Sequence, residues 1–490
     1  MTGSISSPQS RRDFWLRWTR LLITIACQNI IVYGVNLADN IMIGQLGDGA
    51  ELAISGVFIV NQIQFLLQMM LGGIADGTVV MCSRYWGEKN IAAIKKAAAT
   101  AMHFGLILSG LMLAAALLIP GPILSIFTDK PAVIAEATRY LRIVCFTYIF
   151  FAATQVLLGM LRSVECAMIG FVNSCAALVI NLVLNYILIF GHFGAPAMGV
   201  EGAAVATLVS RIAEFGIVVF YLAFMDKKLH VKLSDFFRTD REITGKFMKV
   251  SLPVFLSGTS WGIAMGLQTA ILGHMEDSVI TANSIASTLF QILSVFSYGA
   301  ATAASVMIGK TIGEAASDPE LLKSEIRHRA SRMQGIFLIL GVLTGLSIFF
   351  AKDLIIGFYD VSDTTRDMAL AFMTVLSVTA VGTSYQMPCL TGIVRGGGDT
   401  KFVLFNDIIF MWCIVLPASF IAFRLNLSPV IIFAEKSTWN TIWVAGIINS
   451  AFFPAFLLAP SRDSSPSAGG LEHRQNPPLL TRASAKRSRI

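Results

Sequence analysis

The chain has 490 residues, of which 55% are apolar and 14% are charged, and its mean hydropathy is +0.69. Soluble domains carry about 25% charged residues, so this composition excludes most water-soluble folds. The net charge of +7 does not indicate a nucleic-acid partner, because the Lys and Arg residues stand in short patches between apolar segments. That pattern is typical of membrane topology.

Long apolar segments follow one another along the chain. A helix of about 20 apolar residues crosses a hydrocarbon core of roughly 30 Å. Runs such as 113–119 do not alternate between apolar and polar residues, as the strands of a membrane β-barrel do. The sequence therefore predicts an all-α integral membrane protein with twelve transmembrane helices, at residues 18–43, 52–82, 98–120, 138–162, 168–191, 199–225, 249–273, 279–309, 331–352, 367–394, 402–424 and 438–460.

The loops between these spans alternate in charge. Lys and Arg gather before the first span and after the second, sixth and eighth, whereas the loops 44–51, 192–198 and 273–278 contain neither residue. Because Lys- and Arg-rich loops stay in the cytoplasm, both termini are predicted to be cytoplasmic. We expect a multi-pass protein of the plasma membrane, the inner membrane of a bacterial cell.

The longest polar segment before the tail divides the spans into two groups of six. The sequence predicts a cytoplasmic N-terminal segment at 1–17, an N-lobe at 18–225, a cytoplasmic linker at 226–248 and a C-lobe at 249–460. The basic tail at 461–490 is too polar to bury, so it is predicted to be disordered and cytoplasmic.

Short motifs of the first half recur in the second half, in the same order and about 230 residues later. Ile41–Leu46 corresponds to Ala270–Met275, Arg84–Glu88 to Lys310–Glu314, and Gly159–Arg162 to Gly392–Arg395. Six spans per half is an even number, so the two halves share one orientation. This predicts a parallel repeat about an axis along the membrane normal, with the substrate site between two six-helix bundles.

Several motifs resemble those of the multidrug and toxic compound extrusion (MATE) family, over roughly residues 15 to 425. They are Asn36–Gly47, Tyr85–Gly87, Asn181–Gly191, Gly202–Thr207 and Arg395–Thr400. The resemblance implies a secondary antiporter that exports organic cations or other amphipathic compounds in exchange for Na⁺ or H⁺, by alternating access between two lobes. The alternative is a flippase for a lipid-linked or peptidic substrate. The family character ends near residue 434, before the twelfth predicted span.

Acids within the spans are the first candidates for ion coupling. A carboxylate inside lipid costs about 2.5 to 3.5 kcal/mol on insertion scales, so it suggests a function. Asp39 lies in the first span, with Asn36 on the same helical face, and by resemblance Asn181 and Asn185 join it. Many family members carry an acid where Asn185 stands. The competing interpretation of Asp39 is an acid that pairs or stays hydrated near the outer interface.

A second intramembrane acid, Asp76, lies in the second span. It is either a further proton carrier or a packing and gating partner of a loop cation such as Arg84. Arg211 and Glu214 in the sixth span are expected to neutralise each other near its cytoplasmic end. The repeat partners of Asp39 and Asp76 are uncharged, which suggests one ion site in the N-lobe.

In some members of the family that this chain resembles, the seventh and tenth spans of the C-lobe supply acids. This chain has none at the matching turns, so we do not expect coupling through C-lobe carboxylates. Trp261, Met265, Gln268 and Gln386 lie there instead. They are candidates for the substrate cavity, because an indole offers a cation–π face and Met an adaptable surface. Lipid-facing or core positions are the alternative.

No motif of an enzyme accompanies these candidates. The chain lacks HExxH and a Walker A motif, its six His residues are dispersed, and its seven Cys residues lie in apolar runs, where we expect small core residues. We predict no enzymatic activity, no metal site and no cofactor other than the coupling ion, Na⁺ or H⁺. The expected partners are a small amphipathic substrate and membrane lipid, and the expected state is a monomer.

Overall fold

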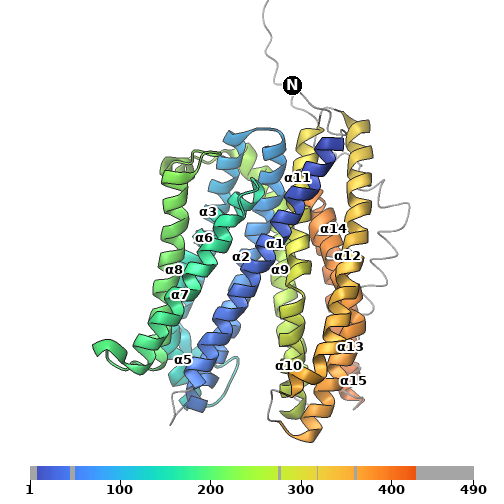
Figure 1. The fold of residues 1–490 in the computed structure, drawn as a ribbon. Helices are drawn as coiled ribbons and strands as arrows, with labels where there is room; N and C mark the ends of the chain where they lie inside the picture. Colours follow the sequence, from blue (N-terminus) through green and yellow to red (C-terminus); the bar gives the residue numbers. More distant parts are fainter. Residues whose placement is uncertain (1–7, 45–49, 274–276, 317, 358–360, 426–490) are drawn as a thin grey trace, which may run out of the picture. The chain divides into compact units, whose positions relative to one another are not determined.

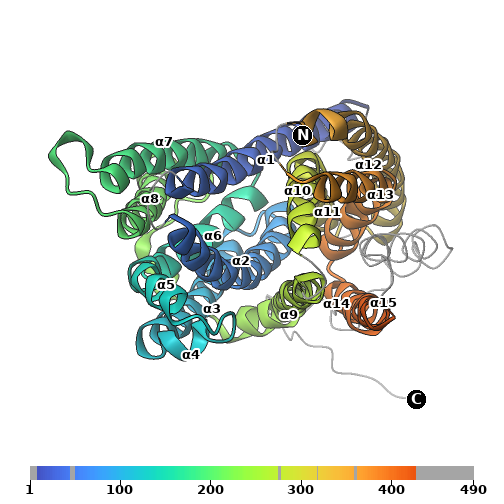
Figure 2. The same ribbon diagram turned by 90° about the horizontal axis from the view of Figure 1, so that it is seen from below.

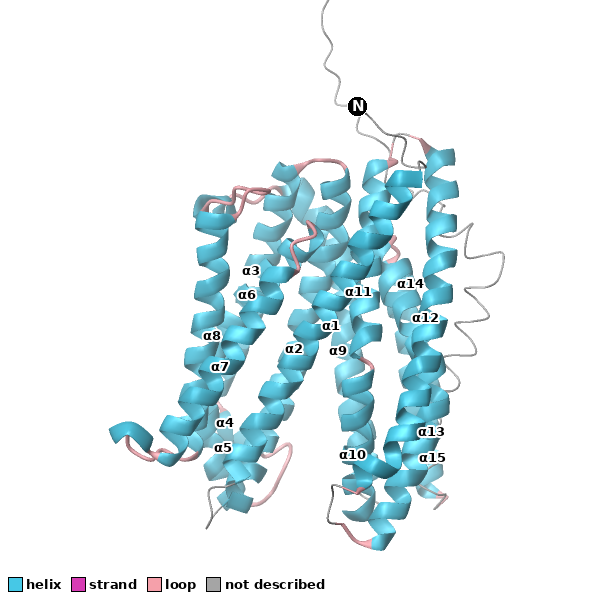
Figure 3. Ribbon diagram, in the orientation of Figure 1, coloured by secondary structure: helices cyan, strands magenta, loops and turns pink. Residues whose placement is uncertain are grey.

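The computed structural model describes residues 8–44, 50–273, 277–316, 318–357 and 361–425. Within this part of the chain every regular element is a helix (Figures 1 and 3). The α-helices are α1 (Pro8–Gly44), α2 (Ala50–Gly87), α3 (Ile91–Leu118), α4 (Pro120–Leu124), α5 (Pro131–Val144), α6 (Thr147–Ser163), α7 (Met168–Phe190), α8 (Val200–Phe220), α9 (Arg241–Gly273), α10 (Asp277–Leu293), α11 (Val295–Glu314), α12 (Pro319–Ile356), α13 (Asp363–Met387), α14 (Thr400–Ile408) and α15 (Leu416–Arg424).

Shorter turns connect or extend these helices. Two of them are 3-10 turns, η1 (His192–Gly194) and η3 (Leu233–Phe237). Three are π-helical turns that continue a span, η2 (Tyr221–Met225), η4 (Pro388–Val394) and η5 (Ile409–Val415).

Eleven of the predicted spans have a counterpart among the described residues. Nine continuous helical segments are long and apolar enough to cross a membrane, and two bent pairs raise the number to eleven. The bends are 51° between α5 and α6 and 42° between α10 and α11, so the predicted spans 138–162 and 279–309 are each broken. The twelfth predicted span and the tail lie outside the described residues. The prediction of an all-α membrane protein is confirmed.

The first helix begins before its predicted span. α1 starts at Pro8, so residues 8–17 continue the helix and are not a separate segment. The reason lies in packing against α12: the rings of Trp18 and Phe337 lie 6.4 Å apart, and Arg11 pairs with Glu325 at 3.4 Å. These contacts order the polar first turns of α1.

The repeat is visible in how the helices pack. We call α1 to η2 the N-lobe and α9 to α15 the C-lobe. In the N-lobe α2 packs against α5 and α6, and α1 against α7; in the C-lobe α10 packs against α13, α11 against η4, and α9 against α14. Between the lobes α2 packs against α9, and α1 against α11 (Figure 2). By the repeat, α1 corresponds to α9, and α2 corresponds to α10 and α11. These corresponding helices make the same contacts in the two lobes.

Glycines of the repeated motifs explain why those motifs recur. A Cβ on Gly87 would collide with the backbone of Lys310, and a Cβ on Gly313 with the backbone of Arg84. A Cβ on Gly159 would lie 3.0 Å from the carbonyl oxygen of Ala75, and the repeat partner Gly392 makes the same approach, 2.8 Å, to that of Ala301. Small residues let membrane helices approach closely and gain van der Waals contact.

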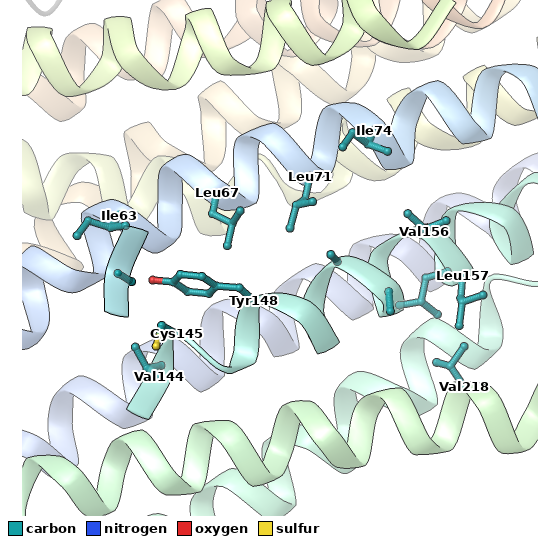
Figure 4. Packing of buried hydrophobic residues seen from close by; sticks show 14 of the residues in the cluster. Ile63, Leu67, Leu71, Ile74, Val144, Cys145, Tyr148, Val156, Leu157 and Val218 are labelled. Carbon is teal, nitrogen blue, oxygen red and sulfur yellow. The ribbon is translucent and has the colours of Figure 1, made fainter. Parts of the chain in front are cut away.

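The N-lobe core is formed mainly between α2, α3, α5 and α6. In Figure 4 the ring of Tyr148 points toward α2, where Ile63, Leu67 and Leu71 line the facing side. Tyr148 is 1% exposed. This packing holds α2, which contributes to both the lobe contact and the site described next.

Several contacts gather at the end of the helices where the linker between the lobes begins. Glu165 pairs with Lys310 at this end, Lys228 donates to the carbonyl of Val164, and Gly87 meets α11. We call it the linker end, because the linker between the lobes starts there after η2.

Candidate functional site

The side chain of Asp39 meets two asparagines of α7. The amide N–H group of Asn185 donates to the Asp39 carboxylate at 2.5 Å and to the Asn181 side-chain oxygen at 3.1 Å. Asn181 and Asn185 are buried and lie four residues apart, on one face of α7. The structure thus brings together three of the residues that the sequence singles out. Asn36 lies one turn earlier in α1, but its side chain is outside the described part.

A small cavity opens beside this cluster. Its volume is about 70 Å³, whereas pockets for drug-sized ligands measure about 300 to 1,000 Å³ and a water molecule takes about 30 Å³. The space therefore suits an ion with a few waters and not a drug-sized ligand. Five helices, α1, α2, α5, α7 and α8, line it through Val32, Val35, Asp39, Val57, Asn61, Gln64, Tyr140, Ser174, Ala177, Asn181, Thr207, Ser210, Arg211 and Glu214.

The lining combines one carboxylate on α1 with many neutral oxygens. Amides and hydroxyls come from α2, α5, α7 and α8. Oxygen ligands of this kind suit hard cations such as Na⁺, and a carboxylate can alternatively take a proton. No cluster of His, Cys, Asp and Glu that could hold a transition metal occurs among the described residues.

Arg211 and Glu214 form the expected ion pair, with 2.8 Å between guanidinium and carboxylate. The sequence predicts this pair near the cytoplasmic end of the sixth span, and that prediction is wrong. Arg211 lies near the middle of α8, and both side chains line the Asp39 cavity. The sequence does not reveal this, because it does not state how α8 is rotated against α1 and α7.

Asp76 does not belong to the cavity. Its carboxylate accepts from Arg395, which follows η4 in the C-lobe, at 3.0 Å. The expected partner Arg84 is wrong, because it pairs with Glu88 at 3.2 Å and lies two turns further along α2, about 12 Å away. Asp76 therefore joins the two lobes.

The sequence does not single out Asp407, an acid of the C-lobe. The Asp407 carboxylate on α14 accepts from the hydroxyl of Ser257 on α9. Asp407 lies inside the predicted span 402–424, so the rule that selects Asp39 would also select it. The expectation of no coupling acid in the C-lobe rests on the seventh and tenth spans alone. Asp407 lies in the eleventh span, so that expectation does not cover it.

The four candidates for the substrate cavity lie within the C-lobe. Trp261 and Met265 pack against a cluster of η5 and α15 that contains Met411 and Val415. The amide of Gln268 donates to the Ser419 hydroxyl at 3.5 Å, and Gln386 is buried in α13. These contacts are helix packing, and a role in substrate binding stays a prediction.

Cysteines behave mostly as expected. All seven are free thiols, and Cys82, Cys145 and Cys389 are buried. Cys413 is exposed, so the prediction of a core position is wrong there.

Glu165 forms a further ion pair between the lobes at the linker end, and a second pair within the N-lobe. Glu165, in the loop between α6 and α7, accepts from Lys310 of α11 and from Arg17 at 3.2 Å. Burial alone would raise the pKa of Glu165, but the charges of Lys310, Arg17 and Lys228 together hold that pKa below its usual value. Glu165 is therefore an ionised partner of two helices.

Comparisons with known proteins agree with this architecture. The MatE family model matches the chain twice, over residues 24–187 and 254–421, which confirms the internal repeat. The uncharacterized transporter YisQ of Bacillus subtilis is 23% identical over 420 residues, which cover 84% of this chain and 88% of YisQ. A probable multidrug resistance protein, NorM of Thermotoga maritima, is 24% identical over 425 residues, 84% of this chain and 86% of NorM.

Solved structures share the fold. A multidrug resistance MATE family transporter of the MOP superfamily, in its outward-facing conformation, has a TM-score of 0.78 and 20% identity, with 90% of this chain and 95% of that chain covered. A MOP superfamily transporter from Pyrococcus furiosus has a TM-score of 0.75 and 21% identity, with 88% and 95% covered. The repeat, the helix bundle and the double match together show that this chain is a membrane transporter and belongs to the MatE family.

Proposed function

We propose that the protein is a secondary active antiporter that exports organic cations or other amphipathic compounds in exchange for Na⁺ or H⁺. The observation that carries this proposal is the Asp39 carboxylate, bonded to Asn185 and facing an ion-sized cavity in the N-lobe. Because a carboxylate in a membrane span is costly without a counter-charge, the site gains most from a cation or a proton. The substrate itself leaves chemically unchanged, so the protein is not an enzyme.

The size of the cavity supports separate sites for the ion and the substrate. A space of about 70 Å³ holds an ion and not a drug. Ion and substrate therefore do not compete for the same space. They are coupled because each favours a different conformation of the lobes. The substrate site lies between the lobes in this proposal, as in other transporters built from two parallel repeats.

The linker end is the cytoplasmic end in this proposal, since the Lys- and Arg-rich loops lie there. Asp76 pairs with Arg395 toward this end, and Glu165 pairs with Lys310 at it. Alternating access then requires these pairs to break, because both connect the N-lobe to the C-lobe. In this proposal the protein acts as a monomer in the plasma membrane and is closed toward the cytoplasm while both pairs are formed.

Purified protein in liposomes tests the proposal. Na⁺ and proton gradients are imposed separately, and the transport of a fluorescent organic cation such as ethidium is followed for the parent and for Asp39→Asn. We expect one gradient to drive transport in the parent, and a loss of at least tenfold in the variant. Asp129→Asn, which removes an exposed carboxylate, is the matched control and should transport like the parent. An unchanged Asp39→Asn protein contradicts the proposal.

The alternative, a flippase for a lipid-linked or peptidic substrate, makes a different prediction. A dedicated flippase does not lower the accumulation of a cationic dye in cells. An exporter lowers it, and the effect disappears when the driving gradient is collapsed.

A further inference from the structure

The Asp39 cavity contains an ion pair that the proposed function does not use. Four ionisable residues line it: Asp39, Tyr140, Arg211 and Glu214. A phenol is neutral at physiological pH, so the charges to be counted belong to the two acids and the arginine. With both acids ionised, they sum to one negative charge.

The pair is held in one geometry. Arg211 and Glu214 lie three residues apart on α8, with 2.8 Å between their charged groups. The guanidinium also lies over the ring of Phe151 on α6, 4.8 Å from its centre, which is a favourable cation–π arrangement. The side chain of Glu214 is only 8% exposed, and that of Arg211 is 30% exposed. Glu214 is thus the buried anchor and Arg211 the more accessible group.

Arg211 also acts on Asp39 itself. Both side chains line the same cavity, so the charge of Arg211 contributes to the electrostatic potential at the Asp39 carboxylate. An arginine has a long side chain and keeps its charge. Without Glu214, Asp39 is the carboxylate that remains for Arg211 in this cavity, so Arg211 becomes a counter-ion that is built into the protein.

We propose that Glu214 holds Arg211 away from Asp39, and that this pair keeps the cavity at one negative charge, so that it accepts one monovalent cation per cycle. This inference rests on the proposed function. Arg211 and Glu214 are then positioning residues that tune the affinity for the coupling ion. Na⁺ or a proton neutralises the cavity, and a second cation makes it positive.

Two single variants should shift the ion dependence in opposite directions and their combination should restore it, which a merely structural role would not do. Glu214→Gln removes the restraint on Arg211, so the half-saturating concentration of the coupling ion rises at least tenfold. Arg211→Gln leaves two acids in the cavity, so that concentration falls at least fivefold. The double variant Arg211→Gln/Glu214→Gln restores one negative charge, and its ion dependence returns to within about threefold of the parent.

The measurement is gradient-driven ethidium transport in proteoliposomes, with the concentration of Na⁺ or H⁺ varied for whichever ion drives the parent. Glu242→Gln and Lys246→Gln are matched controls, because these residues form an exposed Lys–Glu pair one turn apart on α9, with 2.6 Å between their charged groups. Neither control should change the ion dependence. If Glu214→Gln does not fold, the Arg211→Gln protein alone decides, since only the charge argument predicts tighter ion binding.

The inference is overturned if both single variants shift the ion dependence in the same direction, if Arg211→Gln leaves it unchanged, or if the double variant is no better than Glu214→Gln. The proposed function fails separately, when Asp39→Asn transports like the parent. A loss in Asp39→Asn together with parent-like behaviour of Arg211→Gln and Glu214→Gln refutes the charge-balance inference alone.

Discussion

Replacement of Asp76 by Asn removes the charge that joins α2 to Arg395 and keeps the size of the side chain. The two groups lie 3.0 Å apart, and their side chains are 42% and 11% exposed. Fully exposed pairs contribute about 0.2 to 1 kcal/mol, and loss of one partner from a buried pair costs about 3 to 5 kcal/mol. Because Asp76 is partly hydrated, we expect about 1 to 2 kcal/mol, which is a factor of about 5 to 30 in a conformational equilibrium.

The lost energy belongs to the state that is closed at the linker end, since Asp76 and Arg395 lie in different lobes. The variant should therefore populate more of the open state. Spin labels at the exposed positions Lys89 and Arg327, in a protein whose cysteines have been replaced, report the distance between the lobes by pulsed electron resonance. The ratio of long to short distances should rise by the factor above.

Two comparisons decide whether the reasoning holds. The exchanged pair Asp76→Arg/Arg395→Asp should return the distance distribution toward that of the parent. Glu88→Gln, which breaks the exposed pair with Arg84 within α2, should leave it unchanged. If the Asp76→Asn distribution equals that of the parent, the ion pair does not hold this end closed.

Three further predictions concern the site, the lobe contact and its pH dependence. Asn185→Leu removes the donor to Asp39 and should lower gradient-driven transport about tenfold, since a hydrogen bond to a charged group contributes about 1.5 to 3 kcal/mol; Na⁺- or proton-driven flux checks this. Gly313→Ala collides with backbone and should lower the thermal unfolding temperature by the equivalent of about 1 to 3 kcal/mol, whereas Gly110→Ala, which meets open space, should not. The pKa of Glu165 is held below its usual value of 4.5, so its ion pairs stabilise the folded state above about pH 4.5 and are lost as the pH falls through the folded-state pKa. The advantage of the parent over Glu165→Gln in thermal unfolding should be constant from pH 5 to 7 and shrink below pH 4.5; a constant difference at lower pH would contradict this.

The sequence by itself determines the class of fold. Each helix in lipid satisfies its own backbone hydrogen bonds, so a span can be located from local composition, and eleven predicted spans agree with the described helices. The repeat also follows from the sequence, because Gly87, Gly159 and their partners must be small wherever two backbones approach. The cluster of Asp39 with Asn181 and Asn185 could be predicted, since an acid in a span stands out and the family motif names its neighbours.

Only the tertiary structure decided which charged groups meet. Asp76 pairs with a residue 319 positions away, Asp407 meets Ser257 of another helix, and Arg211 with Glu214 faces the Asp39 cavity. Local composition says that a helix crosses the membrane, but not how far it is rotated or at what depth it packs. Those two quantities are set jointly by all the helices that touch it, because close packing selects the rotation and depth at which small and large side chains fit together.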